Sequence, residues 1–180
     1  VKLSECIGHE PLFYAVASHV MEHVPNPLGW LQEILDCLEP GGMIALILPN
    51  RERSMDYYRQ PTSFAQLIGW AIEKPAKPTP TQVMDFLSLS FEDDGGVNFD
   101  EPLPPFSQAK RHYSDTEAIG FAEFVEREDH YLDVHCSVWT PDSFIEVFSR
   151  VIAAGRLDVE IIGPFTGFPG ATPAEFLVYL

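Results

Sequence analysis

The sequence predicts an α/β fold whose strands form a parallel sheet of the doubly wound type. Two apolar runs, Phe13–Ala17 and Met43–Leu48, contain no alternating polar residues, and an amphipathic helical pattern lies between them. Unalternated apolar runs are typical of strands covered on both faces. A strand, helix and strand with short connections form one right-handed βαβ unit. We therefore expect parallel strands with helices packed against the sheet.

The helix of this unit is predicted to begin at Asn26 and Pro27, because Asn is a favoured N-cap and Pro a favoured first helical residue. Apolar side chains then recur at helical spacing on one face: Leu28, Leu31, Ile34, Leu35 and Leu38. The Pro40-Gly41-Gly42 segment predicts the end of the helix before the second strand.

Residues 50–134 are predicted to be a largely helical insertion between strands, within a single domain that spans residues 1–180. Helical spacing of apolar residues predicts helices at 63–73 and 81–89, joined by an extended proline-rich linker over 74–80. Long segments of this kind in a compact domain are usually lids or binding elements.

Regular structure is predicted to resume at Thr140, a plausible N-cap followed by Pro141 at the first helical position. Five apolar residues share one face of this helix, and Gly155 ends it: Phe144, Val147, Phe148, Val151 and Ile152. Residues 157–162 and 175–180 then predict two strands joined by a loop rich in Gly and Pro.

The composition excludes several classes of protein. The chain has 180 residues, 46% of them hydrophobic, which suits one domain with one core. A formal net charge of −16 argues against nucleic acid as a partner. Three cysteines without paired spacing, Cys6, Cys37 and Cys136, argue for a reducing compartment. No apolar run reaches the roughly 20 residues that span a bilayer, so we expect a cytoplasmic protein with no membrane contact.

The segment Ala17–Val24, followed by Asn26-Pro27, the amphipathic helix and a strand ending in Pro49-Asn50, resembles one family. It is similar to the fourth strand, following helix and fifth strand of class I S-adenosylmethionine-dependent methyltransferases, type 11-like, with a Met-Glu-His turn. Val138-Trp139-Thr140-Pro141 and the last helix and strands resemble the end of that domain. The resemblance covers about 13–51 and 135–180. It implies the last four strands of a Rossmann-like methyltransferase sheet.

The family's Gly-x-Gly-x-Gly turn, which brings backbone close to the cofactor, does not occur in the sequence. No acidic residue that would hold the ribose hydroxyls of the cofactor is recognisable either. We therefore expect a fragment or an N-terminally truncated domain, and Val1, which is not Met, favours truncation. The isolated chain is expected to bind the cofactor weakly or not at all, and to expose the edge of its first strand.

In open α/β sheets, ligands bind beyond the carboxyl ends of the strands. The resemblance implies that Ser18 and His19 line the S-adenosylmethionine pocket and that His23 faces the methyl-transfer region. There His23 is a candidate general base, because its ordinary pKa suits that role near neutrality. Four polar residues follow the carboxyl end of the second strand and could reach substrate across the same crevice: Asn50, Arg51, Arg53 and Asp56. Asn50 and Arg51 are the candidate substrate residues.

His19, Glu22 and His23 have i, i+3, i+4 spacing, and two imidazoles with a carboxylate can bind a divalent metal. Similar turns in some quinone-biosynthesis methyltransferases read Glu-x-x-Glu-His, and here His19 stands at the first position. The same letters form the His-x-x-Glu-His signature of inverted zincins, but Pro25 and Pro27 limit any helix to about one turn. We assign no metal ligand from the sequence.

The resemblance implies methyl transfer from S-adenosylmethionine to a small molecule or a sugar. His112, His130 and His135 lie in or beside the insertion, and their spacing singles none of them out as a general base. The alternative is a non-catalytic, degenerate methyltransferase module whose exposed sheet edge and acidic insertion dock a partner or a second copy of the chain.

Overall fold

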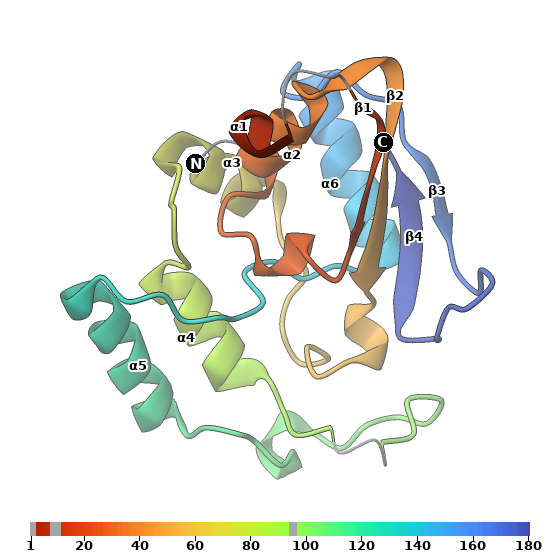
Figure 1. Cartoon of the computed structure of the whole chain (residues 1–180). Coiled ribbons are helices and arrows are strands. Elements are labelled where there is room, and N and C mark those ends of the chain that lie inside the picture. The colour runs from red at the N-terminus through yellow and green to blue at the C-terminus, as the bar shows by residue number, and fades with distance from the viewer. Residues whose placement is uncertain (1–2, 8–11, 94–96) are drawn as a thin grey trace.

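A computed structural model describes residues 3–7, 12–93 and 97–180, and residues 94–96 of the predicted insertion lie outside this range. The described residues contain a mixed sheet with strand order β1-β2-β4-β3 (Figure 1). Strand β1 (Leu12–Ser18) pairs in parallel with β2 (Leu38–Pro49). Strand β4 (Glu175–Tyr179) pairs antiparallel with β2 and with β3 (Ile162–Phe165). The predicted α/β fold is confirmed.

The predicted βαβ unit consists of β1, α2 (Pro27–Leu35) and β2. The Asn26 side chain accepts a hydrogen bond from the Gly29 N–H at 3.1 Å, as expected of an N-cap. The helix is shorter than predicted, because Leu38 already belongs to β2. The glycine pair lies inside that strand, at an irregularity in its pairing with β1. A Cβ at Gly42 would lie 3.0 Å from the Phe13 carbonyl oxygen, so close approach of the strands requires glycine there.

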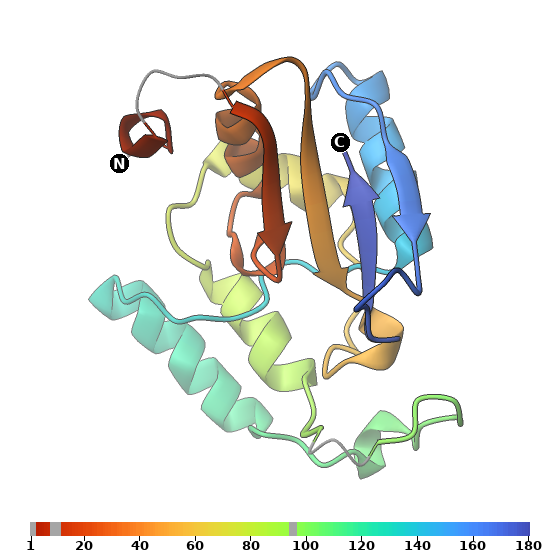
Figure 2. The same ribbon diagram turned by 45° about the vertical axis from the view of Figure 1, so that its right-hand side comes forward.

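Helices cover one face of the sheet (Figures 1 and 2). Alternate side chains of β2 and β4, among them Leu46 and Phe176, pack on α6 (Pro141–Ala153), α3 (Phe64–Glu73) and α2. On β1, Tyr14 and Val16 remain 65% and 63% exposed. The prediction that the first apolar run is covered on both faces is therefore wrong for the described residues.

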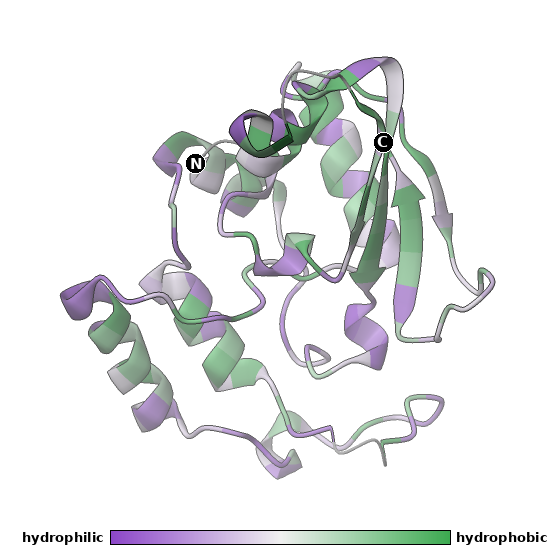
Figure 3. Ribbon diagram, in the orientation of Figure 1, coloured by the Kyte–Doolittle hydropathy of each residue, from purple (hydrophilic) through white to green (hydrophobic). Residues whose placement is uncertain are grey.

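A second, smaller core joins α4 (Pro80–Leu89) to α5 (Asp115–Glu128). Helices α3 and α4 confirm the two helices predicted in the insertion, with capping boxes at Ser63 and Thr79. Helix α5 was not predicted. Its surface alternates polar and apolar residues, as Figure 3 shows, and its clearest signal is the Ser114 and Glu117 capping box. The insertion also contains two 3-10 turns, Arg51–Arg53 and Phe106–Gln108. A short helix, α1 (Leu3–Ile7), precedes β1.

The last predicted helix is confirmed as α6, capped by Thr140 and followed by Gly155 at φ 65°. The antiparallel strand pair is also confirmed, but its first strand begins at Ile162 and not at Leu157. Leu157 is buried against the main core, with Val159 and Ile161 packed beside it. Apolar and charged residues alternate over 157–161 because every second side chain packs on the core, although this segment forms no strand of the sheet.

Candidate functional site

The carboxyl ends of β1 and β2 lie at one edge of the sheet, where open α/β sheets bind their ligands. Ser18 ends β1 and is exposed. His19 follows with a left-handed φ of 53°, and its N–H donates to the Ile47 carbonyl at 2.9 Å. Asn50 follows β2, and its N–H donates to the Ala174 carbonyl at 2.7 Å. Ser18, His19 and Asn50 thus meet at this edge, and their binding roles stay predictions.

The His19 ring connects the end of β1 to the start of β4. Its Nε2 lies 2.9 Å from Oε2 of Glu175, whose Oε1 accepts the Thr172 N–H at 2.8 Å. The hydrogen bond with His19 and the one from Thr172 lower the pKa of the Glu175 carboxyl. The ring remains about half exposed, so it can still contact a ligand at this edge.

Asn50 and Arg51, the two predicted substrate residues, make local contacts. The Asn50 side chain is buried and accepts the Glu52 N–H at 3.1 Å. The Arg51 Nε donates to the Arg59 carbonyl, and its guanidinium lies 5.8 Å from the centre of the Tyr57 ring. Both side chains therefore stabilise the loop after β2, and a substrate role stays a prediction.

His23 lies on a single 3-10 turn, Met21–His23, and not on a continuous helix. Its Nδ1 lies 3.0 Å from Asp133 Oδ1. The His135 ring stands edge-on to the His23 ring, with centroids 4.7 Å apart. Of the histidines in or beside the insertion, His135 is the one that meets His23, and nothing in the local sequence around either residue indicates this contact.

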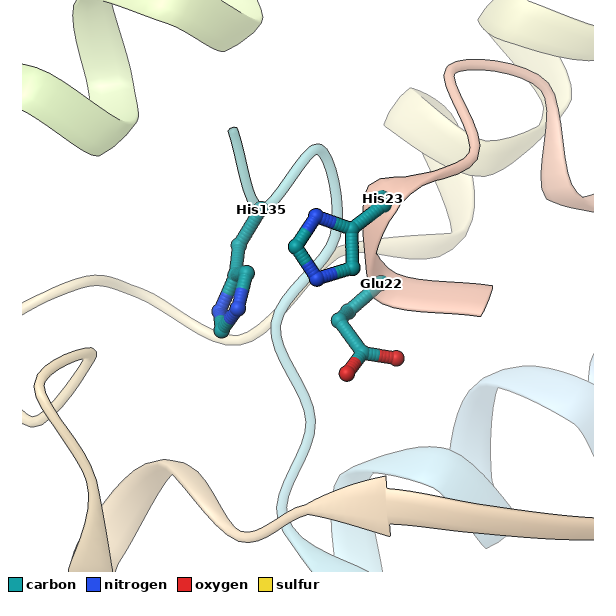
Figure 4. A group of neighbouring side chains, drawn as sticks. All are labelled: Glu22, His23 and His135. Carbon is teal, nitrogen blue, oxygen red and sulfur yellow. The ribbon is translucent and has the colours of Figure 1, made fainter. Parts of the chain in front are cut away.

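Glu22 is fully buried on the same turn, and neither carboxylate oxygen has a hydrogen-bond partner among the described residues. Oε1 lies 3.4 Å from His19 Nδ1 in an orientation that forms no hydrogen bond. The Glu22 backbone carbonyl accepts the N–H groups of Cys136 and Ser137 at 2.5 and 3.2 Å. Side-chain ligand atoms of Glu22, His23 and His135 all lie within 4.8 Å of one another, and Figure 4 shows their arrangement.

His135 is oriented by a buried ionic network that the sequence analysis did not find. Its Nδ1 lies 2.6 Å from Asp56 Oδ2, and the other oxygen of Asp56 accepts Arg59 Nη1 at 2.7 Å. Arg59, which is 1% exposed, also donates to Asp85 Oδ2 and, at 2.8 Å, to the His135 carbonyl. Asp56 was expected to face substrate, but it is buried and holds His135 in place.

Residues 9–79 match a family model described as a methyltransferase domain. This segment of the chain is therefore similar to a methyltransferase domain. The match runs from before β1 to beyond α3, so it includes Ser18, His19, His23, Asn50 and Arg51. No curated protein and no solved structure matches the chain.

The group at the turn combines residues of the matched segment with residues beyond it. Glu22 and His23 lie inside the matched segment, whereas Asp133 and His135 lie beyond it. Backbone hydrogen bonds from Cys136 and Ser137 to Glu22 tie these two parts together. The position of His135 beside His23 therefore follows from the backbone as well as from the side-chain network.

Protonation of the Asp56 carboxyl makes the stability contributed by this network depend on pH. Burial alone would raise its pKa, but the hydrogen bond with His135 and the charge of Arg59 outweigh burial and lower the pKa below the ordinary 3.8. A folded-state pKa below the unfolded value stabilises the folded protein above about pH 4, and this contribution is lost as pH falls through the folded pKa. Urea unfolding should therefore show a larger stability gap between wild type and Asp56→Asn at pH 6 than at pH 3. A gap that does not change with pH would contradict this.

Proposed function

We propose that the chain is the carboxyl-terminal part of an S-adenosylmethionine-dependent methyltransferase that methylates a small molecule or a sugar. The observation that carries this proposal is the parallel β1-β2 pair inside the matched segment, with Ser18 and His19 at its carboxyl end. Methyl transfer makes few demands on side chains, because the sulfonium of the cofactor is already activated and the protein aligns donor and acceptor.

Ser18 and His19 fit one wall of the cofactor pocket. The Ser18 hydroxyl is exposed, and the His19 ring is held by Glu175 while about half of it faces solvent. Both can offer hydrogen bonds to the polar groups of a nucleoside or an amino acid. The opposite wall requires backbone at close range, which in this family a glycine-rich turn provides, and the 180 residues contain no such turn.

The free edge of β1 is where we propose that this second wall attaches. Among the described residues, β1 has one strand neighbour, β2, and its exposed Tyr14 and Val16 line an apolar hollow of about 420 Å³ with Met43 and Phe168. A strand with apolar side chains and one edge without a strand neighbour suits pairing with another strand. We propose that polypeptide carrying the glycine-rich turn covers this edge and face.

On the acceptor side, we propose that His23 acts as the general base. Its ring is about one-third exposed, and Asp133 at Nδ1 orients the ring and leaves Nε2 for the acceptor. A hydroxyl or amine acceptor would lose its proton to this nitrogen as its lone pair attacks the methyl group. Asn50 and Arg51 are proposed to border the acceptor at the end of β2.

Calorimetric titration of the 180-residue chain with S-adenosylhomocysteine tests how complete the pocket is. We expect weak or undetectable binding, because half of the pocket wall is missing. Micromolar affinity would show that these residues suffice to bind the cofactor, and would contradict the proposed second wall at β1.

The reading frame upstream of Val1 tests the enzyme itself. If it encodes an in-frame Gly-x-Gly-x-Gly turn, the complete product should transfer a labelled methyl group from S-adenosylmethionine to a member of a panel of hydroxylated small molecules and sugars. His19→Ala should weaken its S-adenosylhomocysteine binding by about tenfold, as loss of one good hydrogen bond does. A start codon directly before Val1, or a complete product that binds no cofactor, would overturn the proposal in favour of an interaction module.

A cytoplasmic location is part of the same proposal. Cys6, Cys37 and Cys136 are free thiols, and burial raises the pKa of the Cys136 thiol to about 12. In the part of the chain that the structure describes, no helix has both the length and the apolar character that crossing a bilayer requires. Free thiols favour a reducing compartment.

A further inference from the structure

We propose that Glu22, His23 and His135 form a binding site for a divalent transition-metal ion of the Zn²⁺ class. The proposal stands on the geometry of these residues and does not depend on the methyl-transfer reaction. Two imidazole nitrogens and one carboxylate oxygen are a ligand set that Zn²⁺ uses when a fourth position is left for water or substrate.

The three ligand atoms are close enough for one ion. They lie within 4.8 Å of one another, and at bond lengths of about 2.1 Å the ligands of a tetrahedral Zn²⁺ site are about 3.4 Å apart. Side-chain rotations that bring the most distant ligand atoms closer by up to about 1.4 Å would complete the coordination. The two rings and the carboxylate come from the turn after β1 and from the chain before α6 (Figure 4).

Each imidazole already has the outer partner that metal-bound histidines usually have. Nδ1 of His23 pairs with Asp133, and Nδ1 of His135 pairs with Asp56 at 2.6 Å. A carboxylate at Nδ1 places the proton on that nitrogen and leaves Nε2 with a lone pair for the metal. The same partner makes the coordinating nitrogen more basic.

Glu22 is the second, independent observation that points to a cation. Its carboxylate is fully buried, and neither oxygen has a hydrogen-bond partner among the described residues. The nearest basic group is Nδ1 of the half-exposed His19, 3.4 Å from Oε1, and a buried carboxylate is costly unless a positive charge accompanies it. The surrounding network holds four carboxylates and one guanidinium, so it favours a cation: Glu22, Asp56, Asp85, Asp133 and Arg59.

Two neighbouring groups are not part of the proposed ligand set. The Cys136 Sγ donates to the His23 and Val134 carbonyls, and it is not in the group of mutually close ligand atoms. His19 pairs with Glu175 through Nε2, so the metal group differs from the His19, Glu22 and His23 set that sequence spacing alone suggests. With an ion bound, Nε2 of His23 would be a metal ligand and could not act as the general base, and the ion itself would lower the pKa of an oxygen ligand such as an acceptor hydroxyl.

Calorimetry with Zn²⁺, supported by visible absorption of the Co²⁺-loaded protein, tests the site. All proteins carry Cys6→Ser, because the exposed Cys6 thiol can bind Zn²⁺ by itself. We expect one ion per chain. Glu22→Gln and His135→Gln should each weaken binding by about 100-fold, and Asp133→Asn by about tenfold because it removes only an outer partner. The matched control His112→Gln removes an exposed histidine of the same insertion and should leave the affinity unchanged.

Circular dichroism of each variant separates loss of a ligand from loss of the fold. Zn²⁺ affinity that survives both Glu22→Gln and His135→Gln in folded protein would overturn the site. Loss of binding in His19→Gln but not in His135→Gln would overturn this ligand set. Stoichiometric binding of Mg²⁺ in preference to Zn²⁺ would overturn the assigned metal class. The absence of any metal binding would overturn the site itself.

Discussion

Arg59→Ala is expected to lower the free energy of unfolding by about 3–5 kcal/mol, because it removes one partner of a buried ion pair. Arg59 and Asp56 are both about 1% exposed and meet at 2.7 Å. Without the guanidinium, the Asp56 carboxylate remains buried with only His135 beside it, and Asp85 and the His135 carbonyl each lose a donor. Urea unfolding at pH 7, followed by circular dichroism, measures the change.

Arg127→Ala is the matched control. Arg127 pairs with Glu128 on the exposed side of α5, and both side chains are more than half exposed. Exposed pairs of this kind contribute at most about 1 kcal/mol. Arg59→Lys should fall between these two results, because lysine keeps the charge but cannot form the forked contacts of the guanidinium. A loss below about 1 kcal/mol for Arg59→Ala would show that the network does not stabilise the fold.

The elements that sequence reasoning found are those whose signals are local. Asn26, Ser63, Thr79 and Thr140 each cap a helix through a side-chain contact made within three residues, so they can be recognised without knowledge of the fold. Helix α5 was missed because its apolar stripe is weak, although Ser114 and Glu117 carry the same capping signal.

Contacts between distant segments could not be predicted in the same way. His23 meets His135, and Asp56 meets Arg59 and His135, because the insertion folds back over the turn after β1. Nothing in the spacing of these residues indicates burial or contact. The sequence therefore predicted the candidate ligand-binding edge from strand ends, but it could not single out the partner of His23.

The uncovered face of β1 has a different physical cause. Phe13–Ala17 is apolar throughout, and such runs indicate strands buried on both faces. In the described residues, helices cover only one face, and Tyr14 and Val16 are exposed on β1. The composition of the run therefore suits a strand with more neighbours than it has here, which agrees with the proposed second wall of the cofactor pocket.

Glu22→Met is expected to raise the free energy of unfolding of the metal-free protein by about 1–3 kcal/mol, the cost of leaving a buried polar group unsatisfied. Glu22 is 0% exposed, and its oxygens have no hydrogen-bond partner in the described chain. Methionine has a similar length and no charge, so it can occupy the same space. Residues retained at a cost in stability are typical of functional sites.

Added Zn²⁺ should make wild type more stable than Glu22→Met, the reverse of the order expected without metal. Saturating ion stabilises a protein that binds it only when folded, by an amount that grows with the ratio of free ion to dissociation constant. Wild type should therefore gain stability in urea unfolding when Zn²⁺ is added, whereas Glu22→Met should not, because it lacks the anionic ligand. If Glu22→Met is less stable than wild type without metal, the contact with His19 at 3.4 Å compensates the burial of the carboxylate, and the physical argument for a cation at this turn fails.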